Sequence, residues 1–136
     1  RIFAARKNYK PLNVEDIRAY CLSLPLADEY FPFDETTLAF RVQGKIFAII
    51  DLDNTEWFVL KCDPDYAIDL RDRYDEIRGA WHMNKKHWNQ LNLFGALPEE
   101  LIRQLIRHSY AEVVKKLPVA KRKEVLTSAA AQGYTL

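Results

Sequence analysis

The stretch that decides the fold runs from residue 37 to residue 62 and reads TLAFRVQGKIFAIIDLDNTEWFVLKC. Apolar and polar residues alternate over Thr37–Val42, as they do in a half-buried strand. Gln43 and Gly44 predict a tight turn, because glycine tolerates the positive φ that such a turn needs, and Lys45–Ile50 then predict a returning strand. Trp57–Cys62 is rich in β-branched and aromatic residues, which predicts a third strand of the same antiparallel meander.

Three other segments combine an apolar stripe at helical spacing with a start signal. Asn13 is a predicted N-cap of the first, and Asp63 followed by Pro64 begins the second. Pro98 begins the third, whose end is marked by Pro118. These signals predict helices over residues 14–23, 64–74 and 98–117.

Residues 77–83 and 88–93 predict two more strands, joined by the short polar turn Asn84-Lys85-Lys86. The resulting order α-β-β-β-α-β-β-α predicts an α+β fold, a two-layer sandwich with an antiparallel five-stranded sheet and helices on one face. Its predicted core includes Phe40, Phe47, Phe58, Ile102 and Leu105. The domain is expected over residues 13–118, after a basic N-terminal extension (1–12) and before a basic, alanine-rich tail (119–136) that is expected to fray.

Composition favours a globular protein of the cytoplasm. The 136 residues suit one domain, and 49% of them are hydrophobic. No apolar run approaches the ~20 residues that cross a bilayer, and no secretory signal is recognised, so a membrane is not an expected partner. Cys21 and Cys62 lie in apolar stretches and are predicted to be free, reduced thiols.

Charge is distributed unevenly along the chain. Residues 1–12 contain four basic and no acidic side chains, whereas residues 13–60 contain three basic and nine acidic ones. Residues 61–136 are again basic, with thirteen positive against ten negative side chains. This segregation permits a basic face for an anionic partner, although an ordinary solvated surface is the usual meaning of such a local excess of charge.

The segment Gly79–Asn89, which reads GAWHMNKKHWN, resembles the signature of the MmcQ/YjbR-like family. The resemblance covers about residues 13–118 and extends to five further motifs in the family's order: Leu22–Pro25, Asp28–Phe33, Leu60–Pro64, Leu97–Ile102 and His108–Tyr110. It implies a CyaY-like or secretion-chaperone-like two-layer fold. It also implies DNA binding through a double-wing motif, in which β-hairpins lie on the duplex.

The predicted turn between the last two strands contains two lysines, Lys85 and Lys86, and is followed by the tryptophan Trp88. Such a group can hold phosphates and stack on a base or sugar. A polar turn followed by a core tryptophan is the alternative interpretation. With the first hairpin as a second wing, the candidate nucleic-acid-binding residues are Asn84, Lys85, Lys86, His87, Trp88 and Lys45.

Other groups of reactive residues are weaker indications of a functional site. His82, His87 and His108 lack the spacing of a metal site, and the acidic residues Asp28, Glu29, Asp34 and Glu35 resemble a frataxin-like acidic ridge only in chemistry. Cys62 precedes a helix start that would stabilise a thiolate, yet its place at the end of a strand favours a buried thiol instead.

No nucleophile–base pair, phosphate loop or dinucleotide motif is present, so neither catalytic residues nor a cofactor is predicted. The sequence therefore predicts a non-enzymatic binding protein with double-stranded DNA as its partner. A protein-binding adaptor that uses the sheet face or the third helix is the alternative, and a metal-binding protein or an enzyme is a third possibility.

Overall fold

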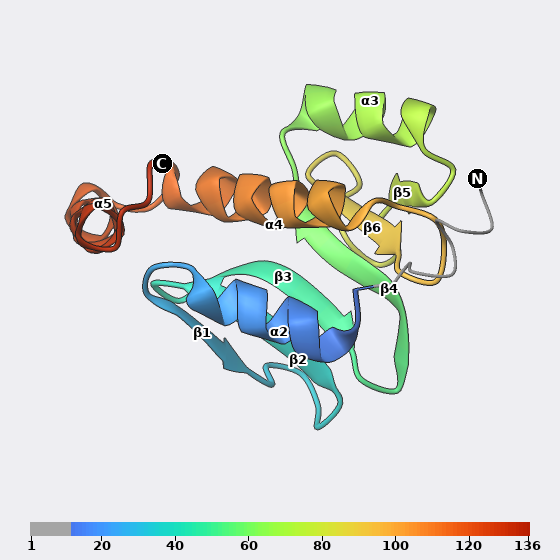
Figure 1. The fold of residues 1–136 in the computed structure, drawn as a ribbon, viewed down its shortest axis with the longest axis horizontal. Coiled ribbons are helices and arrows are strands. Elements are labelled where there is room, and N and C mark those ends of the chain that lie inside the picture. Colours follow the sequence, from blue (N-terminus) through green and yellow to red (C-terminus); the bar gives the residue numbers. More distant parts are fainter. Residues whose placement is uncertain (1–11) are drawn as a thin grey trace, which may run out of the picture.

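A computed structural model describes residues 12–136, in which six strands form one antiparallel sheet with the order β1-β2-β3-β4-β6-β5 (Figure 1). The helices of the described residues are α2 (Val14–Ser23), α3 (Pro64–Arg73), α4 (Glu99–Val114) and α5 (Val119–Ala131). The strands are β1 (Ala27–Tyr30), β2 (Thr37–Val42), β3 (Lys45–Asp51), β4 (Asn54–Lys61), β5 (Ile77–Gly79) and β6 (Trp88–Asn92). No helix of this part of the chain is long and apolar enough to cross a membrane. The predicted basic extension lies outside the described residues except for Leu12.

The predicted α+β class with an antiparallel sheet is confirmed, but the sheet has six strands instead of the predicted five, so the predicted order of elements lacks one strand. The additional strand is β1, which pairs with β2 at the edge of the sheet. Two of its four residues are acidic, so it lacks the alternation that identifies a strand. Ion pairs hold it in place, since Asp28 contacts Arg41 at 2.9 Å and Glu29 contacts Arg18 of α2. Charged residues of this kind also protect an edge strand from pairing with other chains.

The predicted strand over residues 77–83 is also too long. β5 ends at Gly79, and the last backbone bond between it and β6 runs from the Ala80 N–H to the Trp88 carbonyl at 3.0 Å. The Trp81 N–H instead donates to the side chain of Gln90, and His82 has a φ of 67°. Residues 80–87 therefore form a loop, here called the 80–87 loop, rather than a short hairpin turn.

The C-terminal tail is helical instead of frayed. α5 begins after Pro118, and its residues Val125 and Ala129 are buried. Its alanines favour a helix, and two residues four positions apart are enough to make a narrow apolar contact. The Gln43 side chain donates to Glu124 at 2.8 Å, which places α5 beside the turn between β2 and β3.

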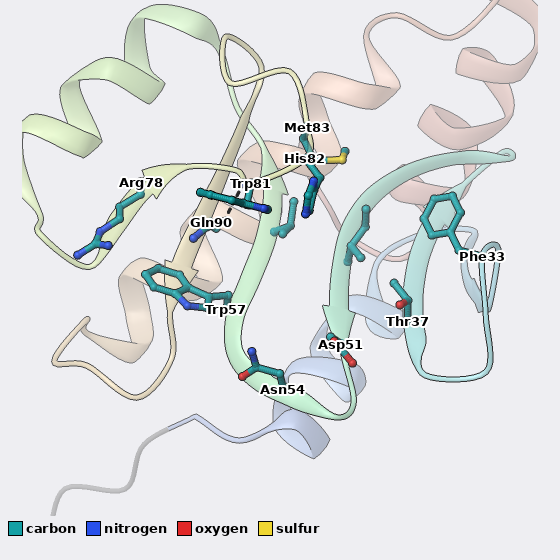
Figure 2. Close-up of a pocket in the computed structure, with 12 residues that line it drawn as sticks. Phe33, Thr37, Asp51, Asn54, Trp57, Arg78, Trp81, His82, Met83 and Gln90 are labelled. Atoms are coloured by element: carbon teal, nitrogen blue, oxygen red, sulfur yellow. Dashed lines mark hydrogen bonds between the residues drawn. The ribbon is translucent and has the colours of Figure 1, made fainter.

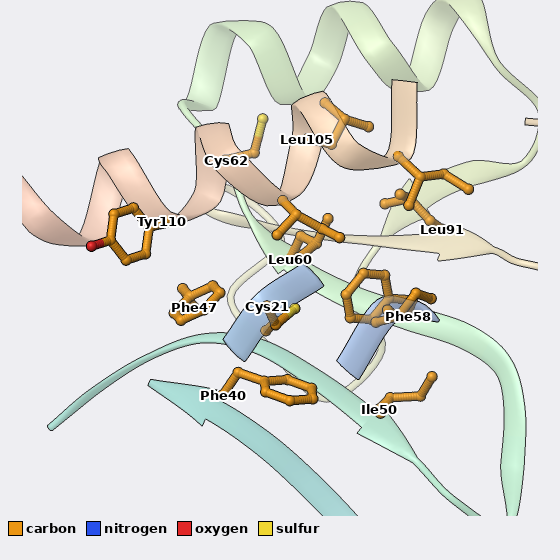
Figure 3. Packing of buried hydrophobic residues seen from close by; sticks show 14 of the residues in the cluster. Cys21, Phe40, Phe47, Ile50, Phe58, Leu60, Cys62, Leu91, Leu105 and Tyr110 are labelled. Atoms are coloured by element: carbon orange, nitrogen blue, oxygen red, sulfur yellow. The ribbon is translucent and has the colours of Figure 1, made fainter. Parts of the chain in front are cut away.

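The core lies on one face of the sheet, where α2, α3 and α4 contribute to one continuous cluster of buried residues (Figure 3). The predicted core residues are confirmed, because Phe40, Phe47 and Phe58 are fully buried and Ile102 and Leu105 are each 3% exposed. Their burial is the main source of stability, at about 1.5–3 kcal/mol for each large apolar side chain. The predicted free thiols are confirmed too, since both cysteines are unpaired and buried.

The predicted helix starts are present as well. The Asn13 side chain accepts a hydrogen bond from the Asp16 N–H at 2.8 Å, and the Asp16 carboxylate accepts one from the Asn13 N–H. The Asp63 carboxylate accepts from two N–H groups at the first turn of α3. Each cap satisfies donors that the helix itself leaves free.

A serine of α4 fills a gap between the two central strands. The ladder of β3 and β4 stops at the pair Ala48–Leu60, and the next residues, Phe47 and Lys61, do not bond each other directly. The Ser109 hydroxyl lies between them, accepting from the Lys61 N–H at 2.9 Å and donating to the Phe47 carbonyl at 2.5 Å. α4 is thus hydrogen-bonded into the sheet as well as packed on it.

Ser109→Ala is expected to destabilise the protein by about 1–3 kcal/mol, because it leaves two buried backbone groups without a partner. Urea unfolding measures the loss. Ser128→Ala on α5 is the control, with an expected change within about 0.5 kcal/mol. Equal unfolding midpoints for the two variants would show that the bridge between β3 and β4 contributes nothing.

A second contact of α4 predicts pH-dependent stability. The Nε2 atom of His108 accepts a hydrogen bond from the Asp63 N–H at 3.1 Å, so the ring must be neutral. Burial lowers the pKa of His108 below its ordinary 6.5. The unfolded chain therefore takes up this proton at a higher pH than the folded chain does. The free energy of unfolding should fall as the pH drops below about 6.5.

His108→Gln is expected to reduce that pH dependence, because the amide oxygen can accept the same bond without titrating. Urea unfolding of both proteins at pH 8, 7.5, 6 and 5 provides the comparison. Between pH 8 and 7.5 their stabilities should differ by a constant amount. A loss of stability toward pH 5 that is as large in the variant as in the wild type would exclude this role of His108.

Candidate functional site

The residues predicted to bind nucleic acid lie at one end of the sheet. Asn84, Lys85, Lys86 and His87 belong to the 80–87 loop, and Trp88 is the first residue of β6. The His87 carbonyl accepts from the Cys62 N–H at 2.7 Å, which joins the loop to the end of β4. Lys45 begins β3 at the same end of the sheet.

These six residues do not all have the same role. The Asn84 side chain accepts from the Lys86 N–H at 3.0 Å, and its carbonyl accepts from the N–H groups of His87 and Trp88. Asn84 therefore shapes the loop. Lys85 and Lys86 are exposed, and Trp88 is half-buried outside the core cluster described for residues 12–136.

A group of four lysines, here called the lysine cluster, surrounds the end of β4: Lys45, Lys61, Lys115 and Lys116. Burial lowers the pKa of Lys61, and so do the positive charges of Lys116, Lys115 and Lys45, against an opposing effect of Glu112. Lys115 is the member that is neutralised, by Glu112 at 2.8 Å. Sequence reasoning missed Lys61, although the alternation Trp57-Val59-Lys61 places it on the face opposite Phe58.

Arg71 of α3 fixes the 80–87 loop. Its Nε donates to the Asn89 side chain at 2.8 Å, and a terminal nitrogen donates to the Lys85 carbonyl. Asn89 is itself buried and donates to the Ala67 carbonyl at 3.4 Å. Gly79 makes room for this arrangement, because a Cβ there would lie 3.0 Å from the Lys85 side chain. The loop is thereby tied to α3 through side chains.

The sheet face opposite the core contains a groove of about 630 Å³, within the ~300–1,000 Å³ typical of ligand sites. In Figure 2 the rings of Trp57 and Trp81 lie on one side of it and Phe33 lies on the other. Its walls are strands and loops, and no helix of the described chain contributes to its lining. The lining residues are Phe33, Thr37, Ile49, Asp51, Asn54, Trp57, Val59, Arg78, Trp81, His82, Met83 and Gln90.

The groove combines aromatic faces with a few polar groups. The Arg78 guanidinium lies 5.6 Å from the centre of the Trp57 ring, a cation–π distance. Thr37, Asp51 and Asn54 are neighbours at the end of the sheet far from the lysine cluster. The other end of the groove approaches that cluster, because Lys61 continues the row of Trp57 and Val59 and pairs with Trp88.

The remaining candidate groups are buried or take part in contacts that stabilise the fold. Burial raises the pKa of Cys62 to about 12, so the thiol is not activated. Asp28 and Glu29 form the ion pairs of β1, and Asp34 accepts from two backbone N–H groups of its own turn. Within residues 12–136 no group of three or more His, Cys, Asp or Glu side chains could hold a metal ion.

Comparison with known proteins identifies the family. The YjbR family model matches residues 22–112. The uncharacterised protein YjbR of Escherichia coli K12 is 31% identical over 113 residues, which are 82% of this chain and 96% of that protein. The uncharacterised protein YbdF of Escherichia coli O157:H7 is 32% identical over 112 residues, covering 82% of this chain and 92% of YbdF.

Two solved structures share the fold. The Deinococcus radiodurans protein DR2400 superposes with a TM-score of 0.79 at 38% identity, covering 85% of this chain and 90% of that one. A Pseudomonas syringae protein has a TM-score of 0.62 at 24% identity, covering 74% of this chain and 97% of its own. On the family match and the identity of its relatives, this chain belongs to the YjbR family.

Proposed function

We propose that this protein is a non-enzymatic DNA-binding protein that holds phosphates at the lysine cluster and the neighbouring 80–87 loop. One observation carries the proposal: Lys116, Lys115 and Lys45 are close enough to Lys61 for their charges to add to the effect of burial in lowering its pKa. Crowded positive charges repel one another. A bound phosphate would relieve that repulsion, and release of its counterions would favour binding.

The surroundings of the cluster support contact with an extended polyanion. The tight turn at Gln43 and Gly44 lies on one side of Lys61, and the 80–87 loop lies on the other. Each carries exposed lysine, Lys45 on the first and Lys85 and Lys86 on the second. These two projections fit the pair of wings that the family resemblance implies.

The non-enzymatic part of the proposal rests on the chemistry of the groove. Its lining supplies aromatic faces, a guanidinium and amides, and its one hydroxyl, that of Thr37, donates to Asp34, whose carboxylate already accepts from backbone N–H groups of its own turn. The activated-thiol interpretation of Cys62 is also disfavoured by its raised pKa.

The protein-adaptor alternative has fewer surfaces available for a partner. The apolar stripe of α4, including Ile102, Leu105 and Ile106, is buried in the core and is not free to dock a polypeptide. Of the two docking surfaces predicted for such a partner, the sheet face is the one that stays open in residues 12–136. Salt separates the two functions, because phosphate binding weakens steeply with salt and an apolar interface does not.

Replacing Lys85 and Lys86 by alanine together is expected to weaken binding of a labelled 15-bp duplex by the same factor for every sequence tested. Phosphate contacts carry no sequence information. The slope of log affinity against log salt should flatten by roughly two units, at about 0.9 per lost phosphate contact. Fluorescence anisotropy from 25 to 200 mM salt measures both effects.

The matched control removes two positive charges elsewhere, through Arg73→Ala on α3 and Arg103→Ala on α4, each of which belongs to a surface ion pair. It should leave the slope nearly unchanged. Equal losses in both double variants would mean that only net charge matters. No binding by the wild type at low salt would refute the proposal.

Lys61→Met should separate binding from folding. The methionine keeps much of the apolar stem but removes a charge that burial and three lysines disfavour. Stability in urea is therefore expected to stay equal or to rise, while duplex affinity falls and the salt slope flattens by about one unit. A variant that binds DNA like the wild type would show that the lysine cluster is not the phosphate site.

A further inference from the structure

The two most exposed aromatic residues of the groove face it from opposite sides. Phe33 and Trp81 are each 70% exposed, and they come from different loops, residues 31–36 and 80–87. Single exposed apolar residues are common on protein surfaces, but here two line one hollow from opposite sides, with Trp57 on the same side as Trp81. In Figure 2 aromatic side chains stand on both sides of the groove, and the aliphatic residues Ile49 and Val59 also line it.

Contacts with neighbouring residues fix the position of Trp81. Its backbone N–H donates to the Gln90 side chain at 2.9 Å, and its ring meets the His82 ring edge to face at 5.6 Å. His82 adopts a φ of 67°, a conformation that histidine tolerates better than most residues. The loop thereby presents an indole to solvent although burying it would be favourable.

The lining matches the chemistry of an unpaired nucleobase. Flat rings and the Arg78 guanidinium offer stacking surfaces, which accept every base because each has a π-face. Gln90, Asn54 and Asp51 offer donors and acceptors for the exposed edge of a base. A base inside a duplex presents neither its faces nor its pairing edge, so only an unpaired base can use both.

The two ends of the groove differ in charge. One end of the groove lies next to Lys61 of the lysine cluster, which pairs with Trp88, and phosphates are favoured there. Asp51 lies at the opposite end, where a phosphate is disfavoured and an exocyclic amino group is a suitable donor. A strand whose backbone follows the lysines can therefore turn its bases into the groove.

We infer that the groove binds unpaired bases, so that the preferred ligand is single-stranded nucleic acid. This inference rests on the proposed DNA-binding function and specifies its ligand. Phosphates at the lysine cluster supply the salt-dependent part of the affinity, and stacking on Trp81 and Trp57 supplies the part that distinguishes a single strand from a duplex.

The test compares a labelled 15-nucleotide oligo(dT) with a labelled 15-bp duplex by anisotropy at 50 mM salt. Oligo(dT) is expected to bind more tightly than the duplex and to quench the tryptophan fluorescence. Trp81→Ala should weaken oligo(dT) binding by about tenfold and leave duplex binding unchanged. Phe94→Ala removes an equally exposed aromatic residue outside the groove, 71% exposed, and should change neither.

The outcomes distinguish a failure of this inference from a failure of the proposed DNA-binding function. If duplex and oligo(dT) bind equally and Trp81→Ala has no effect, while Lys61→Met weakens both, the groove is not a base site and the phosphate site stands. If neither probe binds at 50 mM salt, the proposed function fails and the inference fails with it. Equal losses from Trp81→Ala and Phe94→Ala would also overturn the base site.

Discussion

The contact on which the arrangement depends is the hydroxyl of Ser109 between β3 and β4. Where the two central strands separate, this one group satisfies the donor of Lys61 and the acceptor of Phe47. It fixes the depth and position of α4, and with it the lysines at the end of that helix. The same point of the sheet holds Lys61, so the contact that orders the core also orders the lysine cluster.

Alternation and caps were sufficient to predict much of this fold. β2 follows from alternation, β3 from the turn before it and β4 from its β-branched and aromatic residues. The helices α2 and α3 follow from Asn13 and Asp63 at their starts. β1 could not be found in that way, because ion pairs to Arg41 and Arg18 replace the apolar alternation. α5 was missed because its burial depends on two small contacts that exist only once the rest of the chain has folded.

The same limit applies to the candidate site, where residues adjacent in sequence could be predicted and residues that only the fold brings together could not. The lysines of the 80–87 loop are adjacent in sequence and were predicted together, whereas Lys61, Lys115 and Lys116 meet Lys45 only through the sheet and α4. The groove was not foreseen at all. Alternation tells which residues of a strand share a face, but only the packing of the helices tells which face stays open.

The tie between Arg71 and the 80–87 loop has a consequence for the speed and entropy of recognition. Because a guanidinium holds the Lys85 carbonyl and the Asn89 amide together, the loop is in place before any ligand arrives. A preorganised loop loses little conformational freedom on association. The protein is therefore expected to behave as a rigid receptor, with affinity differences between ligands expressed in how slowly each one leaves.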